Sequence, residues 1–276
     1  MKTFITILMC LAASFGGFAA QIDFVMNPQK YNAIDTPSVS DLPAPVEMRE
    51  DTFIELSDVR IHYQVYGEGE KPLILVHGNG GSVNSLKEAA SYLGSRFTVY
   101  LPESRCHGQS GDPGVITYEL MAKDIAEFIE ALGLEKPTVI GHSDGAINAL
   151  TLAAKYPDLP GAVIACGANS RPETFKPYFP FGVAVANIFK PDKLNDLMLT
   201  LPQFDGEYLS SITCPAYIVC GEHDIMWLTD TVYIHECVKG SDMAVIKGAD
   251  HSSYMSHDGR QTYSLAKDWL EKKDLW

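Results

Sequence analysis

The sequence predicts an α/β fold, a mainly parallel central sheet flanked by helices, in one domain spanning residues 51–276. Short, continuous apolar runs recur along the chain, as expected of strands buried on both faces of a parallel sheet. Patterns with apolar residues on one helical face lie between these runs, and such alternation implies right-handed crossovers. The chain's 276 residues, 46% hydrophobic and 20% charged, suit a globular domain of this size.

The N-terminus is predicted to be a secretory signal peptide, residues 1–19. Lys2 precedes an apolar stretch that ends near Leu11, and small residues follow it. We expect cleavage after Ala19, because cleavage after Ala20 would put Phe18 where a small residue is preferred. An uncleaved anchor is the alternative, but the apolar stretch is shorter than the roughly 20 residues that span a bilayer. We therefore expect an exported protein, secreted or periplasmic, without a stable membrane anchor.

Residues 20–50 are polar and dotted with prolines, which is typical of a linker or a loosely docked arm. Alternating apolar and polar residues in Thr52–Leu56 and Arg60–Tyr66 then predict an antiparallel strand pair. The buried strands are predicted at Pro72–His77, Phe97–Leu101, Thr138–Gly141, Gly161–Cys166, Ala216–Cys220 and Ala244–Ile246. The helices are predicted at Tyr118–Leu132, Ala146–Tyr156 and Gln261–Lys272.

One insertion interrupts the alternation, at about residues 168–212. It contains five prolines and seven aromatic residues and no clear strand pattern. A connection this long inside a compact domain usually has a function. We expect a short helical cap over the site rather than a surface excursion, because surface loops rarely need so many aromatic side chains.

Ser143 is the candidate nucleophile. It stands in Gly141-His142-Ser143-Asp144-Gly145, which fits the G-x-S-x-G turn that holds a reactive serine between a strand and a helix. The glycines fit the tight turn and the strained serine backbone. Chance matches to this motif are common, but here a buried run precedes it and a helical pattern follows it.

His251 and Asp224 are the candidate base and its orienting acid. Both follow predicted strands, and the order serine, acid, histidine is the one that this fold requires. His251 would accept the serine proton, and Asp224 would hold the imidazole and stabilise its cation. Glu222 is the rival acid and His257 the rival base, while Asp250 is too close to His251 in sequence to reach round to its ring.

The loop after the first parallel-type strand, His77-Gly78-Asn79-Gly80-Gly81, is the candidate oxyanion site. Glycines allow main-chain N–H groups to approach a ligand oxygen. We expect the N–H groups of Asn79 and Asp144 to form the oxyanion hole and His77 to brace the loop. A phosphate-binding loop is the alternative, but no Gly-Lys-Ser/Thr follows.

These motifs resemble the α/β-hydrolase superfamily, in its small cap-bearing, serine esterase-like branch. The resemblance runs from about Thr52 to Leu270 and includes the stretch Glu103–Ser110. It departs from the family pattern at Cys106, where glycine is usual, which puts a thiol near the expected pocket. It departs again at Asp250, where glycine commonly precedes the histidine. Neither departure touches the candidate triad.

The resemblance implies a serine hydrolase that uses no cofactor. A nearly neutral, aromatic cap favours a small uncharged ester as substrate, so a carboxylic-ester hydrolase is the leading hypothesis. The alternatives are an aminopeptidase or amidase of the same fold and a non-catalytic binding protein. We expect Phe179, Phe181, Met226 and Trp227 to line the substrate pocket. No cysteine or histidine cluster has metal-site spacing, and a formal charge of −14 disfavours nucleic acid and anionic membrane surfaces as partners.

Overall fold

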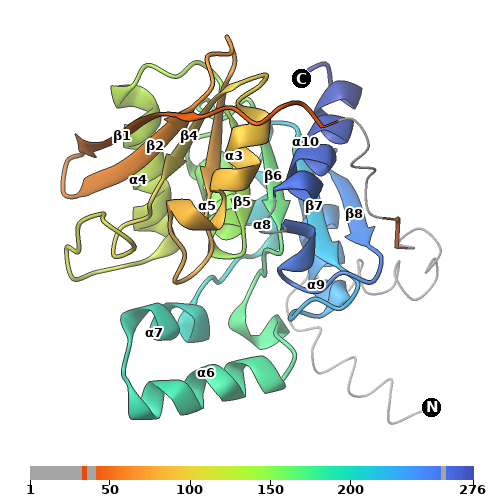
Figure 1. Ribbon diagram of the computed structural model, residues 1–276. Coiled ribbons are helices and arrows are strands. Elements are labelled where there is room, and N and C mark those ends of the chain that lie inside the picture. Colours follow the sequence, from red (N-terminus) through yellow and green to blue (C-terminus); the bar gives the residue numbers. More distant parts are fainter. Residues whose placement is uncertain (1–32, 36–41, 256–258) are drawn as a thin grey trace.

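The computed structural model describes residues 33–35, 42–255 and 259–276, and within them one eight-stranded sheet forms the centre of the molecule (Figure 1). The strand order is β1-β2-β4-β3-β5-β6-β7-β8. The strands are β1 (Met48–Glu55), β2 (Arg60–Tyr66), β3 (Pro72–Val76), β4 (Thr98–Pro102), β5 (Thr138–His142), β6 (Ala162–Cys166), β7 (Ala216–Gly221) and β8 (Asp242–Ile246).

The sheet is mainly parallel, as predicted. β2 pairs antiparallel with both β1 and β4, and every other neighbouring pair is parallel. β6 and β7 are buried at every residue, which explains why their sequences are continuous apolar runs. Because the strands are parallel, the carboxyl ends of β3, β5, β6 and β7 lie at one edge of the sheet, and the loops that follow them meet there.

Helices cover both faces of the sheet. One hydrophobic core joins the sheet to α4 (Tyr118–Ala131), α5 (Asp144–Lys155), α7 (Lys193–Thr200), α8 (Gly206–Ser210) and α9 (Leu228–Cys237). The second core joins the opposite face to α3 (Lys87–Leu93) and α10 (Arg260–Lys272). Adjacent residues of β5 illustrate the alternation, since Val139 packs in the first core and Ile140 in the second.

The connection between β6 and β7 forms the predicted helical cap. It contains the short turn η3 (Pro172–Thr174), α6 (Tyr178–Phe189), α7 (Lys193–Thr200) and α8. Leu197 of α7 and Leu209 of α8 belong to the first core, so both helices pack on the body, whereas α6 has no buried residue. Figure 1 shows α6 and α7 projecting from the body, with α6 farther from the sheet than α7. We use "cap" below for residues 168–212.

Near the N-terminus, the fold includes more than expected. β1 begins at Met48, within the segment predicted to be a linker, and Ile34 forms a parallel bridge with Ile246 along the edge strand β8. The predicted signal peptide and most of the predicted arm lie outside the described residues. Within the described part of the chain, no helix is long and apolar enough to cross a membrane.

Candidate active site

Ser143 occupies a strained turn between β5 and α5. Its φ of 55° and ψ of −119° lie in a region that non-glycine residues rarely adopt. A Cβ at Gly141 would lie 2.0 Å from the Gly145 carbonyl oxygen, and one at Gly145 would lie 2.1 Å from the Val76 carbonyl oxygen. Only glycine therefore fits at either position. The Ser143 N–H donates to the Cys166 carbonyl at 2.8 Å, which fixes the turn against β6.

Ser143, His251 and Asp224 form one chain of hydrogen bonds. The Ser143 Oγ lies 2.9 Å from Nε2 of His251, and the Nδ1 of His251 lies 2.6 Å from Oδ1 of Asp224. An ionised carboxylate can only accept, so Nδ1 carries a proton and Nε2 is left to accept from the serine hydroxyl. The structure thus brings together three side chains that are 27 and 108 residues apart in sequence.

The Asp224 carboxylate is buried and well supplied with donors. Its Oδ2 accepts from the Gly221 N–H at 3.0 Å and from the Tyr254 hydroxyl at 2.9 Å. Burial acts to raise the pKa of Asp224, but the bonds from His251, Gly221 and Tyr254 outweigh it, so the pKa lies below its usual value. Asp224 is therefore ionised at neutral pH. Tyr254 was not predicted from the sequence; it lies in the short turn η4 (Ser253–Met255), which follows His251.

The rival residues are engaged elsewhere. Oε2 of Glu222 accepts from the Gly248 N–H at 2.8 Å, and Oδ1 of Asp250 accepts from the N–H groups of Ser252 and Ser253. Neither carboxylate is bonded to His251. His257, the rival base, lies outside the described residues.

Asn79 and Asp144, the predicted oxyanion pair, are joined through their side chains. The Asn79 amide donates to Oδ2 of Asp144 at 2.9 Å, and the Tyr118 hydroxyl donates to Oδ1 at 2.8 Å. Asp144 is the first residue of α5, so its own N–H has no acceptor within the helix. A Cβ at Gly78 would lie 3.0 Å from the Ser143 Cβ, so the loop approaches the serine closely. This arrangement keeps the loop and the start of α5 together beside Ser143.

His77 braces this loop from below. Its Nδ1 donates to the Gly78 carbonyl at 2.8 Å, and its Nε2 accepts from the Ser104 N–H at 3.0 Å. Burial lowers the pKa of His77 to about 4, so the ring is neutral under ordinary conditions. That protonation state is the one the two hydrogen bonds require.

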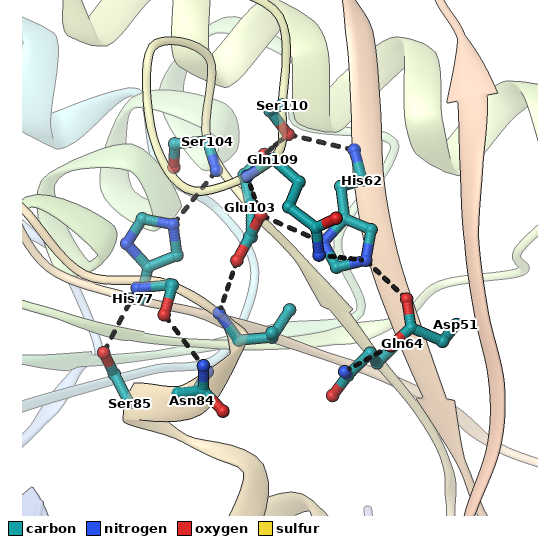
Figure 2. Close-up of polar contacts among 12 residues, drawn as sticks. Asp51, His62, Gln64, His77, Asn84, Ser85, Glu103, Ser104, Gln109 and Ser110 are labelled. Carbon is teal, nitrogen blue, oxygen red and sulfur yellow. Dashed lines mark hydrogen bonds and ion pairs between the residues drawn. The ribbon is translucent and has the colours of Figure 1, made fainter.

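A second polar network anchors the loop that His77 contacts (Figure 2). The buried Glu103 carboxylate accepts from the main-chain N–H groups of Val83 and Gln109 and is bonded to Nδ1 of His62 at 2.9 Å. The other His62 nitrogen lies 2.6 Å from Oδ1 of Asp51. Through these contacts β1, β2 and the Glu103–Ser110 stretch are held against the turn that follows Asn79.

Cys106, which replaces the usual glycine, has a φ of 63°. This left-handed conformation explains why glycine is common there. The expectation of a thiol near the pocket is not met, because the Cys106 Sγ donates to Asp112 at 3.3 Å and is not among the described residues that line the cavity.

A cavity of about 370 Å³ lies over the serine. Besides Ser143 and His251, it is lined by His77, Gly78, Asn79, Gly81, Ser85, Leu86, His142, Phe179, Met198, Ile225, Ser252 and Met255. None of these described lining residues is Asp, Glu, Lys or Arg. The described lining residues therefore contribute no carboxylate, ammonium or guanidinium group to the cavity.

The cavity wall differs from the one expected. Phe179 lines it, but Phe181, Met226 and Trp227 do not. Residues two apart in a helix point about 200° apart, so Phe181 lies on the opposite side of α6 from Phe179 and is 72% exposed. Met226 is buried beside the bridge between its backbone and Phe175, and Trp227 is exposed before α9. The sequence did not identify Met198, Ile225 or Met255, because their turns and helices carry no motif.

In the described part of the chain, no group of three or more His, Cys, Asp or Glu side chains is placed to hold a metal ion. The site offers a serine hydroxyl, an imidazole that can take its proton, an ionised carboxylate behind it, and N–H groups beside the serine.

Comparisons with known proteins agree with this architecture. A family model described as the alpha/beta hydrolase fold matches residues 71–185. Serine hydrolase BPHL of Homo sapiens is 27% identical over 252 residues, which cover 79% of this chain and 85% of that protein. The enol-lactonase from Burkholderia xenovorans LB400 superposes with a TM-score of 0.65 at 17% identity, over 80% of this chain and 100% of its own. A thermophilic esterase from Thermogutta terrifontis superposes with a TM-score of 0.64 at 22% identity, over 82% of this chain and 98% of its own.

The family match covers β3 to β6, including the turn at Ser143. The chain has the α/β-hydrolase fold, and these matches support its membership of that superfamily and hydrolase activity.

Proposed function

We propose that the protein is an exported serine hydrolase that cleaves uncharged carboxylic esters through an acyl-enzyme intermediate. The observation that carries this proposal is the hydrogen-bonded chain from Ser143 through His251 to Asp224, beside a cavity with uncharged walls. The proteins that this chain is similar to include serine hydrolase BPHL and a thermophilic esterase.

The mechanism follows from the geometry. Nε2 of His251 takes the Ser143 proton as Oγ attacks the ester carbonyl, and the negative charge of Asp224 stabilises the imidazolium. The N–H groups of Asn79 and Asp144 stabilise the tetrahedral oxyanion. The imidazolium then protonates the leaving alkoxide. The acyl group on Ser143 is removed by a water that His251 deprotonates in the same way.

The cavity supports an uncharged substrate. An aminopeptidase needs an anion to hold the substrate's ammonium group, and no carboxylate is among the described residues that line the cavity. Phe179, Met198 and Ile225 instead offer apolar surface to an acyl or alkyl group. A non-catalytic binder is the weaker alternative, because binding alone does not require the hydrogen-bonded chain or the strained serine turn.

A panel of matched substrates tests this proposal. We expect p-nitrophenyl acetate and butyrate to be hydrolysed, and the alanine and proline p-nitroanilides to be hydrolysed at least about 100-fold more slowly in kcat/KM. Faster cleavage of the anilides would replace the esterase with an aminopeptidase. Lack of turnover on both classes would favour the binding protein.

Export rests on the signal peptide at residues 1–19 and is tested separately. We expect the secreted or periplasmic protein from an expressing bacterium to begin at Ala20, or at Gln21 if cleavage follows Ala20. N-terminal sequencing that returns Met1 in the cytoplasmic fraction would contradict it.

A further inference from the structure

The outward face of α6 is apolar along the whole helix. The large exposed side chains of the helix are Tyr178, Phe181, Val185, Ile188 and Phe189. Their spacing of three or four residues places them on one side. Phe181, Ile188 and Phe189 are 72%, 76% and 85% exposed. A helix this apolar is normally buried, so among the described residues the outer face lacks the contact that its composition favours.

The polarity of α6 is inverted relative to an ordinary surface helix. Its one side-chain amide, Asn187, donates to Oδ1 of Asp196 at 2.6 Å and accepts from the Asp192 N–H at 2.7 Å. Both contacts lie on the side of α7, which packs against α6. The helix thus turns its amide toward the protein and its hydrocarbon toward solvent.

The charges around α6 differ from those of the rest of the chain. No acidic residue stands between Glu173 and Asp192, whereas the whole chain has a formal charge of −14. The charged residues in that interval are Lys176, which precedes the helix, and Lys190, which follows it. Trp227 is 51% exposed, and its main-chain N–H donates to the carbonyl of Thr174, which lies just before α6. Tryptophan and tyrosine beside an apolar face are residues enriched where lipid meets water, whereas the Lys176 ammonium is bonded to the Asp224 carbonyl.

We propose that the outer face of α6 docks on the surface of uncharged, zwitterionic lipid. The helix has 12 residues, so it lies in the interface and does not span the bilayer. A second copy of the chain fits less well. The outward strip is about 18 Å long and about 10 Å wide, on the order of 200 Å², whereas a stable dimer buries about 800 Å² on each partner.

Docking would place the active site close to the lipid. Phe179, on the inner side of the same helix, lines the cavity over Ser143. The cavity would then lie about one helix diameter, roughly 10 Å, from the lipid surface. This consequence rests on the proposed function and points to esters that partition into lipid. The docking itself does not depend on catalysis.

Flotation with phosphatidylcholine vesicles tests the docking, using full chains that carry Ser143→Ala so that lipid is not hydrolysed. The test variant adds Phe181→Gln, Ile188→Gln and Phe189→Gln. The matched control adds Met48→Gln and Val115→Gln, two exposed apolar residues on the body. We expect the parent and the control to float with equal partition coefficients, and the α6 variant to bind at least about tenfold more weakly. Binding should persist at high salt and be weaker on vesicles that contain anionic lipid.

Three results would overturn the proposal. The parent could fail to float, the α6 variant could float as well as the parent, or the parent could form an α6-dependent dimer in sedimentation without binding vesicles. Circular dichroism verifies that the α6 variant is folded. If the chain with Ser143 intact hydrolyses soluble esters but the Ser143→Ala chain does not float, the docking is overturned and the proposed function stays in place. If the Ser143→Ala chain floats but the chain with Ser143 intact hydrolyses no ester, the proposed function is overturned and the docking stays in place.

Discussion

The body and the cap of this protein differ in how tightly their residues are packed. In the body, the residues around Ser143 have almost no freedom, since a Cβ at Gly141 or Gly145 would collide with the backbone at 2.0 or 2.1 Å. In the cap, α6 has no buried residue at all. The candidate acid, base and nucleophile all stand on loops of the body, whereas the cap supplies Phe179 and Met198 to the cavity wall.

Many contacts connect the two regions, and they include bonds from Ser170 and Thr174 to Asp230. Three others involve the candidate site or the cap helix α7. The Asn79 amide donates to the Leu194 carbonyl at 3.1 Å, the Lys176 ammonium donates to the Asp224 carbonyl at 2.6 Å, and Lys193 is paired with Asp112. The first two reach residues of the candidate site through a single bond each. Changes in the body should therefore alter the rate of chemistry itself, and changes in the cap should alter which substrates react.

The largest effect is expected from Ser143→Ala. It removes the nucleophile, so kcat/KM for p-nitrophenyl acetate should fall by about 10⁴-fold or more. The thermal unfolding midpoint should stay close to that of the parent, because the change removes only one hydroxyl, which faces the cavity. Steady-state kinetics and a melting curve measure both. Turnover that survives in this variant would remove Ser143 from the mechanism.

The next largest effect is expected from Asp224→Asn. The amide cannot balance the charge of His251 and stabilises the wrong tautomer, so we expect a loss of about 10³- to 10⁴-fold in kcat. Glu222→Gln is the matched control, because Glu222 bonds only to the Gly248 N–H and should retain nearly full activity. If both variants lose activity to the same degree, the acid is misassigned.

The brace under the oxyanion loop should make stability depend on pH. Burial lowers the pKa of His77 to about 4, below the unfolded value of about 6.5, so its contribution is present above pH 6.5 and is lost as the pH falls toward 4. The shift corresponds to at most about 3 kcal/mol. His77→Gln keeps a donor and an acceptor but does not titrate. Urea unfolding at pH 7 and pH 5 should show a smaller loss in this variant than in the parent, and equal losses would contradict the assignment.

The smallest effect is expected in the cap. Phe179→Ala should lower kcat/KM for butyrate and longer esters by about 10- to 100-fold while leaving acetate nearly unchanged. Phe181→Ala is the matched control, since that ring faces away from the cavity, and it should leave the whole acyl-length series unchanged. If Phe179→Ala lowers kcat/KM equally for all acyl lengths, this ring packs the cap and does not contact the acyl group of the substrate.

The difference between body and cap also decides what the sequence can predict. The parallel sheet follows from apolar runs, and Ser143, Asp224 and His251 could be located because each stands just after such a run. The glycines of the serine turn are dictated by local sterics. Phe179 and Phe181 could not be told apart, because the rotation of α6 about its axis depends on packing against α7, and apart from Asn187 the helix is apolar around its whole circumference. The bonds from Tyr254 to Asp224 and from Asn79 to Leu194 could not be predicted either, since each joins residues on different loops of the site.

The most direct test of the central claim is covalent labelling by a fluorophosphonate, read by peptide mass spectrometry. The account predicts one adduct per chain, on Ser143, formed rapidly in the parent and in Phe179→Ala, slowly in Asp224→Asn, and not at all in Ser143→Ala. The catalytic groups would then belong to the body and be independent of the cap. An adduct on another residue, or undiminished labelling of Ser143→Ala, would contradict the account.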